Sequence, residues 1–382
     1  MRRLLCGVVV TPARVMDEGW VLIEDGTVAE LGTGTPPSAD VTHEFPEGLI
    51  LPGLIDPHVH GGGGLSMSGS DPRAVAGAAR CHLSMGTTML FGGVVTAPIE
   101  QMATAITAVA GADFPSIAGI YLEGPFLAPS RRGAHPAEHL RGPTSEEIES
   151  FLATANGALR MLTLAPELAG GFAAIALLQE RGVIPAVGHS ACTYEEAHEA
   201  IRLGAKVLTH AFNGLDPLSA RAPGPLPAFL EQEVTTVEVI NDGVHVHGAL
   251  VGMLWQTIGP DRIMFISDAT PAAGVGDGEY LENGNRISVV GAVARDSSGG
   301  LAGGADGLVR ALQVGRESLG LPLTDLVRMT STTAARTFGL HVGAGDIVPG
   351  TPAALLMVDR GLRPRLSVLG ETTHSPDGDS TD

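Results

Sequence analysis

LPGLIDPHVHGGGG, residues 51–64, ends an apolar run with two histidines one residue apart and then continues with four glycines. On a β-strand, residues i and i+2 point to the same face, so His58 and His60 project side by side. The glycines allow a sharp turn that leaves space above the two imidazoles. Two neighbouring imidazoles at a strand end predict half of a metal site. The alternative is a pair of surface histidines near a loop.

The overall composition limits the classes of protein to consider. The chain has 382 residues, enough for one large domain and a smaller one, and 44% of them are hydrophobic. Its formal charge is −19, from 23 basic and 42 acidic residues. Nucleic acids and anionic membranes require basic surfaces, so we expect neither as a partner.

The cysteines and the apolar segments indicate a cytoplasmic location. The three cysteines, Cys6, Cys81 and Cys192, are too few and too scattered for a disulfide framework, which favours a reducing compartment. The apolar run near the start is too short for a signal peptide and is typical of a first β-strand. We find no apolar stretch close to the roughly 20 residues that a membrane-spanning helix needs.

The pattern along the chain predicts a split organisation. Residues 1–49 and 344–370 consist of short strands and turns and form one small β-sandwich domain. Residues 50–343 alternate apolar strands with amphipathic helices, as in a parallel sheet covered on both faces. About eight such repeats favour a TIM-like (β/α)8 barrel of the metallo-hydrolase type over an open sheet. Residues 371–382 are polar and acidic, and we expect a disordered tail.

Ionisable residues stand at or just after the ends of the predicted barrel strands. In a β/α barrel these strand ends converge on one mouth, where active sites lie. Each residue alone has a simpler explanation, such as a helix cap for Asp268 or a loop histidine for His189. Together they form a ligand set typical of zinc or iron(II) rather than calcium or magnesium. The residues are His58, His60, Glu123, His189, His210, His245 and Asp268.

These motifs, taken in order, resemble those of the N-acetylglucosamine-6-phosphate deacetylases of the amidohydrolase superfamily. The resemblance covers residues 50–310, and the flanking residues suit the small β-domain of that family. A dihydropyrimidinase-type relative would need a metal-bridging lysine, but the nearest candidate, Lys206, begins a strand. The matching stretches are LPGLIDPHVHGGGG, YLEGPF…RRGAHP, AVGHSACTYEEA, LTHAFNGL and INDGVHVH…ISDATPAAG.

The resemblance implies hydrolysis of the acetamide of N-acetylglucosamine 6-phosphate to glucosamine 6-phosphate and acetate. It implies that Glu123, His189 and His210 hold the principal metal, zinc or iron. His58 and His60 would hold a second ion where one is bound, with Glu123 as the bridge, so one or two ions per subunit are expected. Asp268 is implied as the catalytic acid/base, and His245 as a contact to the substrate carbonyl.

The resemblance also implies residues that bind the substrate, and it implies a homodimer. Asn213 and Gly214 would hold the phosphate, and Arg221 would reach the phosphate in the neighbouring subunit. The other implied substrate residues are Ala134, His135, Asp242, Gly243, Val244, His245, Leu301, Ala302 and Gly303. Two positions depart from the family pattern, Gly304 in place of serine and Ala354 in place of aspartate.

The expected chemistry follows from the difficulty of amide hydrolysis. A bound metal lowers the pKa of its water to about 7 and so supplies hydroxide at neutral pH. Asp268 would take a proton from that water and give it to the departing amine. One alternative is an N-acyl hydrolase acting on N-acetylgalactosamine 6-phosphate or an N-acyl amino acid. The other is a non-catalytic metal-binding protein, which would have no need of Asp268.

Overall fold

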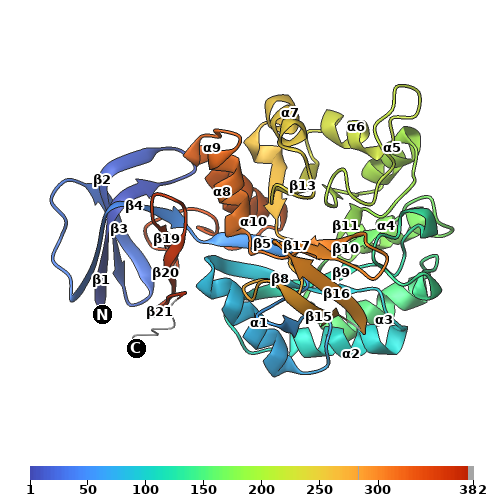
Figure 1. The fold of residues 1–382 in the computed structure, drawn as a ribbon, viewed down its shortest axis with the longest axis horizontal. Coiled ribbons are helices and arrows are strands. Elements are labelled where there is room, and N and C mark those ends of the chain that lie inside the picture. The colour runs from blue at the N-terminus through green and yellow to red at the C-terminus, as the bar shows by residue number, and fades with distance from the viewer. Residues whose placement is uncertain (283, 377–382) are drawn as a thin grey trace.

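Eight parallel strands form the central sheet of the computed structural model, which describes residues 1–282 and 284–376 (Figure 1). The sheet closes after β14, where Val59 pairs with Ala269 in a parallel bridge. The Ala269 carbonyl also accepts hydrogen bonds at 2.8 Å from the backbone N–H groups of His60 and Gly61. The predicted β/α barrel is therefore confirmed. Its strands, in spatial order, are β5 (Leu54–Val59), β8 (Thr87–Val95), β9 (Ile117–Glu123), β10 (Leu159–Leu164), β11 (Ile184–Val187), β12 (Val207–Leu208), β13 (Thr236–Ile240) and β14 (Ile263–Ile266).

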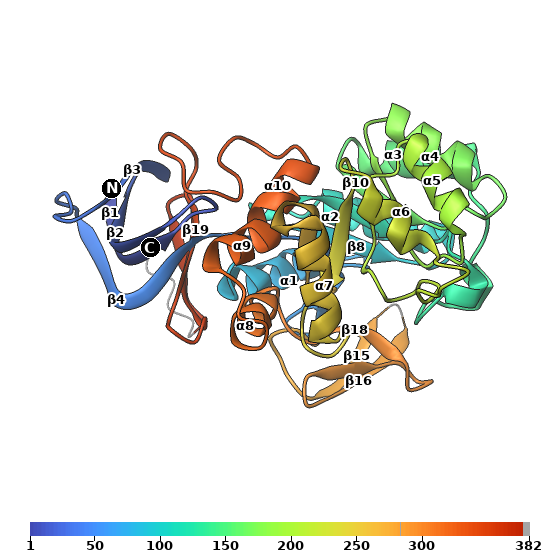
Figure 2. The same ribbon diagram turned by 90° about the horizontal axis from the view of Figure 1, so that it is seen from above.

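Helices surround this sheet in the order that the sequence pattern predicts (Figures 1 and 2). Local signals begin several of them: the Asp71 side chain caps the helix that starts at Pro72, and Thr193 and Glu196 form a capping box. The helices are α1 (Pro72–Ser84), α2 (Ile99–Ala110), α3 (Ser145–Ala155), α4 (Gly171–Glu180), α5 (Tyr194–Arg202), α6 (Pro225–Glu231), α7 (Gly248–Ile258), α8 (Val309–Glu317), α9 (Leu323–Val327) and α10 (Thr333–Thr337).

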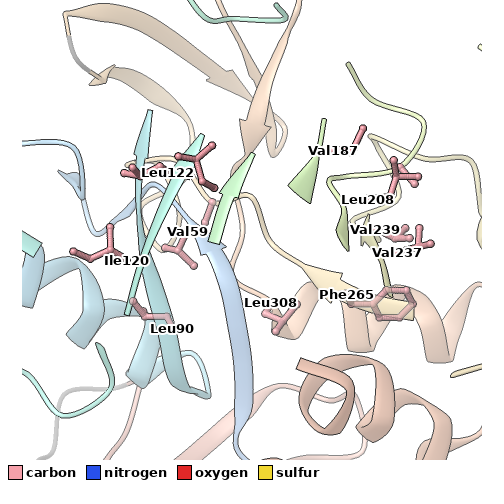
Figure 3. Packing of buried hydrophobic residues seen from close by; sticks show 14 of the residues in the cluster. Val59, Leu90, Ile120, Leu122, Val187, Leu208, Val237, Val239, Phe265 and Leu308 are labelled. Carbon is pink, nitrogen blue, oxygen red and sulfur yellow. The ribbon is translucent and has the colours of Figure 1, made fainter. Parts of the chain in front are cut away.

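The hydrophobic core of the barrel has two parts. The larger part lies between strands and helices and includes Val59, Leu122 and Phe265 (Figure 3). The second part gathers Ile55, Phe91, Tyr121 and other strand residues with Phe338. The polar side chains of the site lie at or just beyond the carboxyl ends of the strands, as Glu123 does at the end of β9 and Asp268 does two residues after β14.

The predicted small β-domain is confirmed as a separate seven-stranded sheet that combines strands from residues 2–52 with strands from residues 354–374 (Figure 1). The sheet bends over on itself: the Val28 N–H donates to the Thr351 carbonyl at 2.9 Å, and strands from both ends share one apolar core. The strands, in spatial order, are β21 (Thr372–His374), β20 (Pro364–Leu369), β19 (Ala354–Val358), β4 (Val41–Pro52), β1 (Arg2–Val10), β2 (Val15–Glu24) and β3 (Thr27–Thr33).

The end of the chain differs in part from the expectation of a disordered tail over residues 371–382. Thr372–His374 form β21, which pairs with β20 because Ser367–Leu369 still offer an open strand edge. Residues 377–382 lie outside the described part of the chain. Within residues 1–282 and 284–376, no helix is both long enough and apolar enough to cross a membrane.

An antiparallel four-stranded sheet is inserted between β14 and α8, within the range predicted as barrel (Figure 2). Short apolar segments here pack around Ile287, Val289 and Ala302 rather than against the barrel helices. We call residues 278–304 the meander. Its strands are β15 (Gly278–Glu282), β16 (Asn285–Val290), β17 (Val293–Arg295) and β18 (Leu301–Gly304), and a separate short pair, β6 (Gly61–Gly62) and β7 (Leu65–Ser66), follows β5.

Candidate active site

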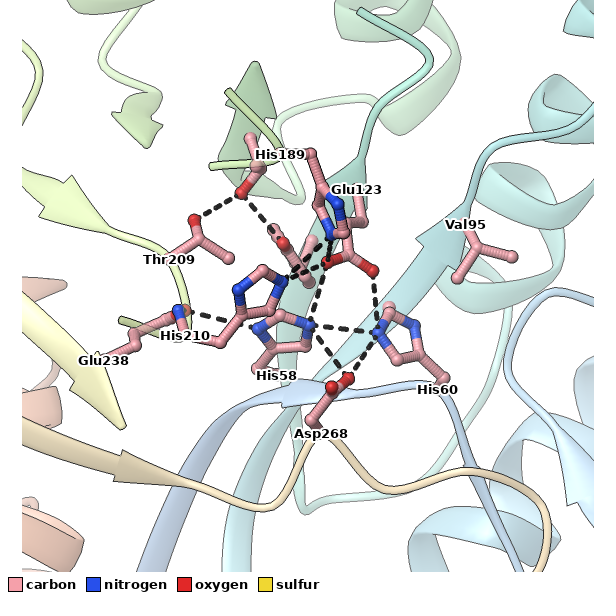
Figure 4. Close-up of polar contacts among 12 residues, drawn as sticks. His58, His60, Val95, Glu123, His189, Thr209, His210, Glu238 and Asp268 are labelled. Carbon is pink, nitrogen blue, oxygen red and sulfur yellow. Dashed lines mark hydrogen bonds and ion pairs between the residues drawn. The ribbon is translucent and has the colours of Figure 1, made fainter. Parts of the chain in front are cut away.

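Two groups of side chains meet at the carboxyl ends of the barrel strands and share Glu123 (Figure 4). In the first group, Glu123 Oε1 lies 3.1 Å from His189 Nε2 and 3.0 Å from His210 Nε2. In the second group, His60 Nε2 lies 3.1 Å from both Glu123 Oε2 and Asp268 Oδ1. His58 Nε2 completes this second group at 3.3 Å from Asp268 Oδ1. The predicted convergence of these strand ends is thus present.

Three of these residues have backbone conformations that side chains other than glycine rarely adopt. His189, His210 and Asp268 have φ values of +48°, +27° and +50°. Each follows its strand by two residues, so the chain turns there and brings the side chain inward over the barrel. Such conformations cost about 1–3 kcal/mol each and cluster at functional sites. The strained backbone positions therefore carry side chains of the two groups, which is typical of a functional site.

Hydrogen bonds on the far side of the imidazoles determine where the ring protons lie. His189 Nδ1 lies 2.8 Å from the Arg131 carbonyl, and His210 Nδ1 lies 3.1 Å from the Asn213 carbonyl. A carbonyl can only accept, so both Nδ1 atoms carry protons. In the neutral rings, the two Nε2 lone pairs then face each other at 3.0 Å, beside the Glu123 carboxylate. Converging lone pairs without a donor between them suit a divalent cation.

The charges of the site also favour a bound cation. Burial favours the neutral acid, but the charges of His58 and His135 hold the pKa of Glu123 well below its usual range. Burial opposes the charged form of His60, but hydrogen bonds with Asp268 and Glu123 raise its pKa to about 10. The buried carboxylates therefore draw positive charge into the site. A divalent cation supplies that charge and displaces the ring protons.

A cavity of about 500 Å³ opens above the two groups, a size suited to a small ligand. It brings together most of the predicted site residues. His135 lies deepest among the predicted sugar contacts, with its Nε2 3.4 Å from Glu123 Oε2. The predicted residues that line the cavity are His60, Glu123, Ala134, His135, His189, His210, Asn213, Gly214, His245, Asp268, Leu301, Ala302 and Gly303.

Five predicted residues do not line the cavity. His58 is fully buried beneath it. Asp242 instead holds His245, with its Oδ2 2.7 Å from His245 Nδ1, while Gly243 and Val244 form the exposed turn between them. Arg221 is exposed in the loop before α6. Asp242 therefore acts on the site through His245 rather than by lining the cavity.

Several polar residues of the site were not predicted from the sequence, and four of them are ionisable groups at the cavity or directly beneath it. Glu238 is fully buried beside His58. Arg132, Glu282 and Arg286 line the cavity, the last two from the meander. Burial raises the pKa of Glu282 to about 7. Of these residues, Arg132 could have been found from the sequence, because it lies in the RRGAH stretch two residues before the predicted Ala134.

The two departures from the family pattern have local structural explanations. A Cβ on Gly304 would lie 2.3 Å from the Ser267 carbonyl oxygen, so this backbone has no room for a side chain. The Gly304 N–H donates to the Asp268 carbonyl at 2.7 Å and so connects the meander to the segment that follows β14. Ala354 begins β19, away from the cavity, and its carbonyl accepts a hydrogen bond from the Gly53 N–H at 2.8 Å.

Gly93 on β8 gives His60 the space it occupies. A Cβ on Gly93 would lie 2.7 Å from His60 Nδ1 and 2.7 Å from the Val59 carbonyl. We expect Gly93→Ala to displace His60 and weaken a cation held by the second group about 10- to 100-fold, as for loss of a ligand's support. Elemental analysis of the purified variant after dialysis against a chelator measures this effect.

Gly92→Ala is the matched control, because its Cβ would meet Val109, between strand and helix, rather than a histidine. It should lower the melting temperature without a selective loss of one cation. Equal metal retention by the Gly93→Ala variant and the wild type would contradict the role given to Gly93.

A β/α barrel that gathers histidine and carboxylate side chains in one cavity at its carboxyl-terminal face has the architecture of barrel hydrolases with a divalent-cation site. Residues 49–377 match the amidohydrolase family, and the chain belongs to that family.

Relatives with assigned activities match most of the chain. The N-acetylgalactosamine-6-phosphate deacetylase of Escherichia coli O157:H7 is 34% identical over 91% of this chain and 93% of its own. The N-acetylglucosamine-6-phosphate deacetylase of Vibrio furnissii is 33% identical over 81% of this chain and 78% of its own.

Solved structures agree with membership of the amidohydrolase family. The N-acetyl-D-glucosamine-6-phosphate deacetylase of Mycobacterium smegmatis superposes with a TM-score of 0.91 at 36% identity, over 96% of this chain and 98% of its own. An aspartate-to-alanine variant of that enzyme, solved in complex with N-acetyl-D-glucosamine-6-phosphate, has the same TM-score and identity over 97% of this chain.

Proposed function

We propose that this enzyme hydrolyses the acetamide of N-acetylglucosamine 6-phosphate to glucosamine 6-phosphate and acetate. One observation carries the proposal: Asp268, an acid/base candidate, shares a sugar-sized cavity with two groups of histidine and carboxylate ligands. Relatives that bear this activity in their names, at 33–36% identity over most of the chain, support the choice of substrate. The few, scattered cysteines favour a reducing compartment, so the proposed location is the cytoplasm.

The chain's own residues can divide the work of hydrolysis. Glu123, His189 and His210 would hold one divalent cation, zinc or iron, and His58, His60 and Asp268 would hold a second, with Glu123 between them. When bound, such a cation makes water a better nucleophile and polarises a carbonyl. Asp268 accepts a proton from the attacking water and returns it to the departing amine, because a carboxylate can do both in turn.

His245 is suited to hold the oxygen of the reacting carbonyl. It lines the cavity, and its Nδ1 is fixed by Asp242 Oδ2 at 2.7 Å, which leaves Nε2 for a ligand. Burial disfavours its charged form, but the hydrogen bond to Asp242 raises the pKa of His245. The raised pKa favours the protonated ring, in which Nε2 carries a proton. That N–H can donate a hydrogen bond to the oxygen on which negative charge develops.

The phosphate of the substrate would be held by residues of the loop that follows His210. Asn213 and Gly214 line the cavity and would supply an amide side chain and a backbone N–H. Arg221 is exposed and outside its own cavity, so its proposed contact is to the phosphate held by a neighbouring subunit of a homodimer. A guanidinium is suited to bidentate contact with a phosphate.

Acetate release measured on three substrates tests the proposed function. N-acetylglucosamine 6-phosphate should be hydrolysed, whereas the unphosphorylated sugar should be a much poorer substrate. The metal content of the same preparation is measured by elemental analysis. Bound metal without acetate release from any of the three would contradict the proposed function and leave the cation site intact.

The third substrate is N-acetylgalactosamine 6-phosphate, the second candidate. The observation that favours it is the 34% identity to a relative named for that activity. The two sugars differ only in the orientation of one hydroxyl, so the ratio of their kcat/KM values decides between them.

The proposed phosphate contact predicts a selective effect of Arg221→Ala. We expect KM for the phosphorylated sugar to rise about 10- to 100-fold, because a charge-assisted contact is worth roughly 1.5–3 kcal/mol, while KM for the free sugar changes little. Steady-state kinetics on both substrates measure the difference. Arg202→Ala is the control, since Arg202 on α5 pairs with Glu199 on the surface, away from the cavity. Equal effects on both substrates would remove Arg221 from phosphate binding.

A further inference from the structure

Glu238 is a buried carboxylate at the base of the site, next to His58 (Figure 4). It lies on β13 between Val237 and Val239 and is fully buried. Its Oε2 lies 3.3 Å from His58 Nδ1 and accepts a hydrogen bond from the His210 backbone N–H at 3.4 Å. Within the described residues, its Oε1 is buried without a hydrogen-bond partner. An isolated buried carboxylate is costly, so nearby positive charge must offset it.

The contact with Glu238 sets the orientation of His58. The other ring nitrogen of His58, Nε2, faces the other members of the second group. It lies 3.0 Å from His60 Nε2 and 3.3 Å from Asp268 Oδ1. A proton on Nδ1 is then shared with Glu238, and the lone pair of Nε2 points at the second group. The ring of Tyr121 packs edge-on at 4.4 Å and restricts rotation of the imidazole.

The hydrogen-bond partner of Nδ1 in His58 differs from that in the other histidines of the two groups. His189 and His210 donate their Nδ1 protons to neutral backbone carbonyls. His60 Nδ1 is buried without a partner in the described residues. Only His58 among these four is supported by a carboxylate. Such a partner makes the imidazole a more basic ligand and adds negative charge to the second group alone.

We propose that Glu238 is a positioning residue that holds His58 in the Nδ1-protonated form and thereby enables the second group to retain its own divalent cation. The inference rests on the proposed function, because it concerns the cation site used there. It predicts two ions per chain with separable affinities. The ion held by His58, His60 and Asp268 depends on Glu238, and the ion held by His189 and His210 does not.

Metal retention by Glu238→Gln tests the proposal. The glutamine has the same shape but lacks the charge. After dialysis of the zinc-loaded protein against graded concentrations of a chelator, elemental analysis should show one ion released at about 10- to 100-fold lower chelator concentration than in the wild type. The other ion should be released as before. Asp325→Asn is the control, because Asp325 lies on α9 and bonds Trp255 Nε1 at 2.9 Å, outside the cavity.

A second measurement needs no variant at position 238. In the zinc-loaded wild type labelled with nitrogen-15 histidine, NMR should show the His58 proton on Nδ1, assigned by comparison with His58→Asn. A His58 proton on Nε2 would overturn the proposal, as would a wild type that holds only one ion. Identical metal release by the wild type and Glu238→Gln would also overturn it. Acetate release by the wild type tests the proposed function separately. The role of Glu238 and the proposed function can therefore be contradicted independently of each other.

Discussion

Asp268→Asn is expected to lower kcat for N-acetylglucosamine 6-phosphate by about 10⁴-fold, the upper end for loss of one general acid–base group. The upper end is appropriate because Asp268 serves both water activation and amine departure. Asparagine keeps the shape of the side chain but cannot carry the proton. Acetate release under saturating substrate measures the change.

Metal content distinguishes the loss of proton transfer from the loss of the site. Asp268 belongs to the second group only, so the ion held by Glu123, His189 and His210 should remain in the variant. Asp325→Asn, which removes a carboxylate outside the cavity, should keep full activity. Near-normal turnover by Asp268→Asn would refute its assignment as the acid/base.

Glu123→Gln is expected to lower activity at least as much as Asp268→Asn does, through the loss of bound cations rather than of proton transfer. Glu123 is the one side chain shared by the two groups, with Oε1 toward His189 and His210 and Oε2 toward His60. Without its charge, each cation loses a ligand and the buried histidines lose their main counter-charge. We expect each ion to be bound more than about 100-fold less tightly, beyond the range for outer-shell partners, and activity to fall to background.

Elemental analysis of Glu123→Gln, followed by assay with excess zinc, checks this result. Glu238→Gln provides the comparison, because it should lose one ion where Glu123→Gln loses both. Glu199→Gln, on the surface of α5, should lose neither. Retention of two ions by Glu123→Gln would contradict its role as the shared ligand.

The barrel and most of the site could be predicted because each depends on local patterns. Alternating apolar strands and amphipathic helices define parallel strands, and parallel strands end at one edge. Glu123, His189, His210 and Asp268 could therefore be placed together although up to 145 positions separate them in the chain. The pairing of His58 with His60 follows from the two-residue period of a strand.

The meander could not be predicted in the same way. Residues 278–304 contain short apolar segments that resemble barrel elements, and only their packing around Ile287 and Val289 makes a separate sheet of them. That sheet brings Glu282 and Arg286 to the cavity. The family pattern gave Asp242 a contact with substrate, whereas the folded turn directs its carboxylate to His245.

The sequence by itself determined the barrel, the family and the set of candidate ligands, because the period of a strand and the position of its end depend on neighbouring residues. Only the tertiary structure decided that Glu238 supports His58 and that Arg221 stays outside its own cavity. In the stretch TTVEVI, Glu238 can point into the barrel or toward the helices, and closure of the barrel selects the inward direction. A contact between β5 and β13, 180 residues apart, exists only when the sheet has closed.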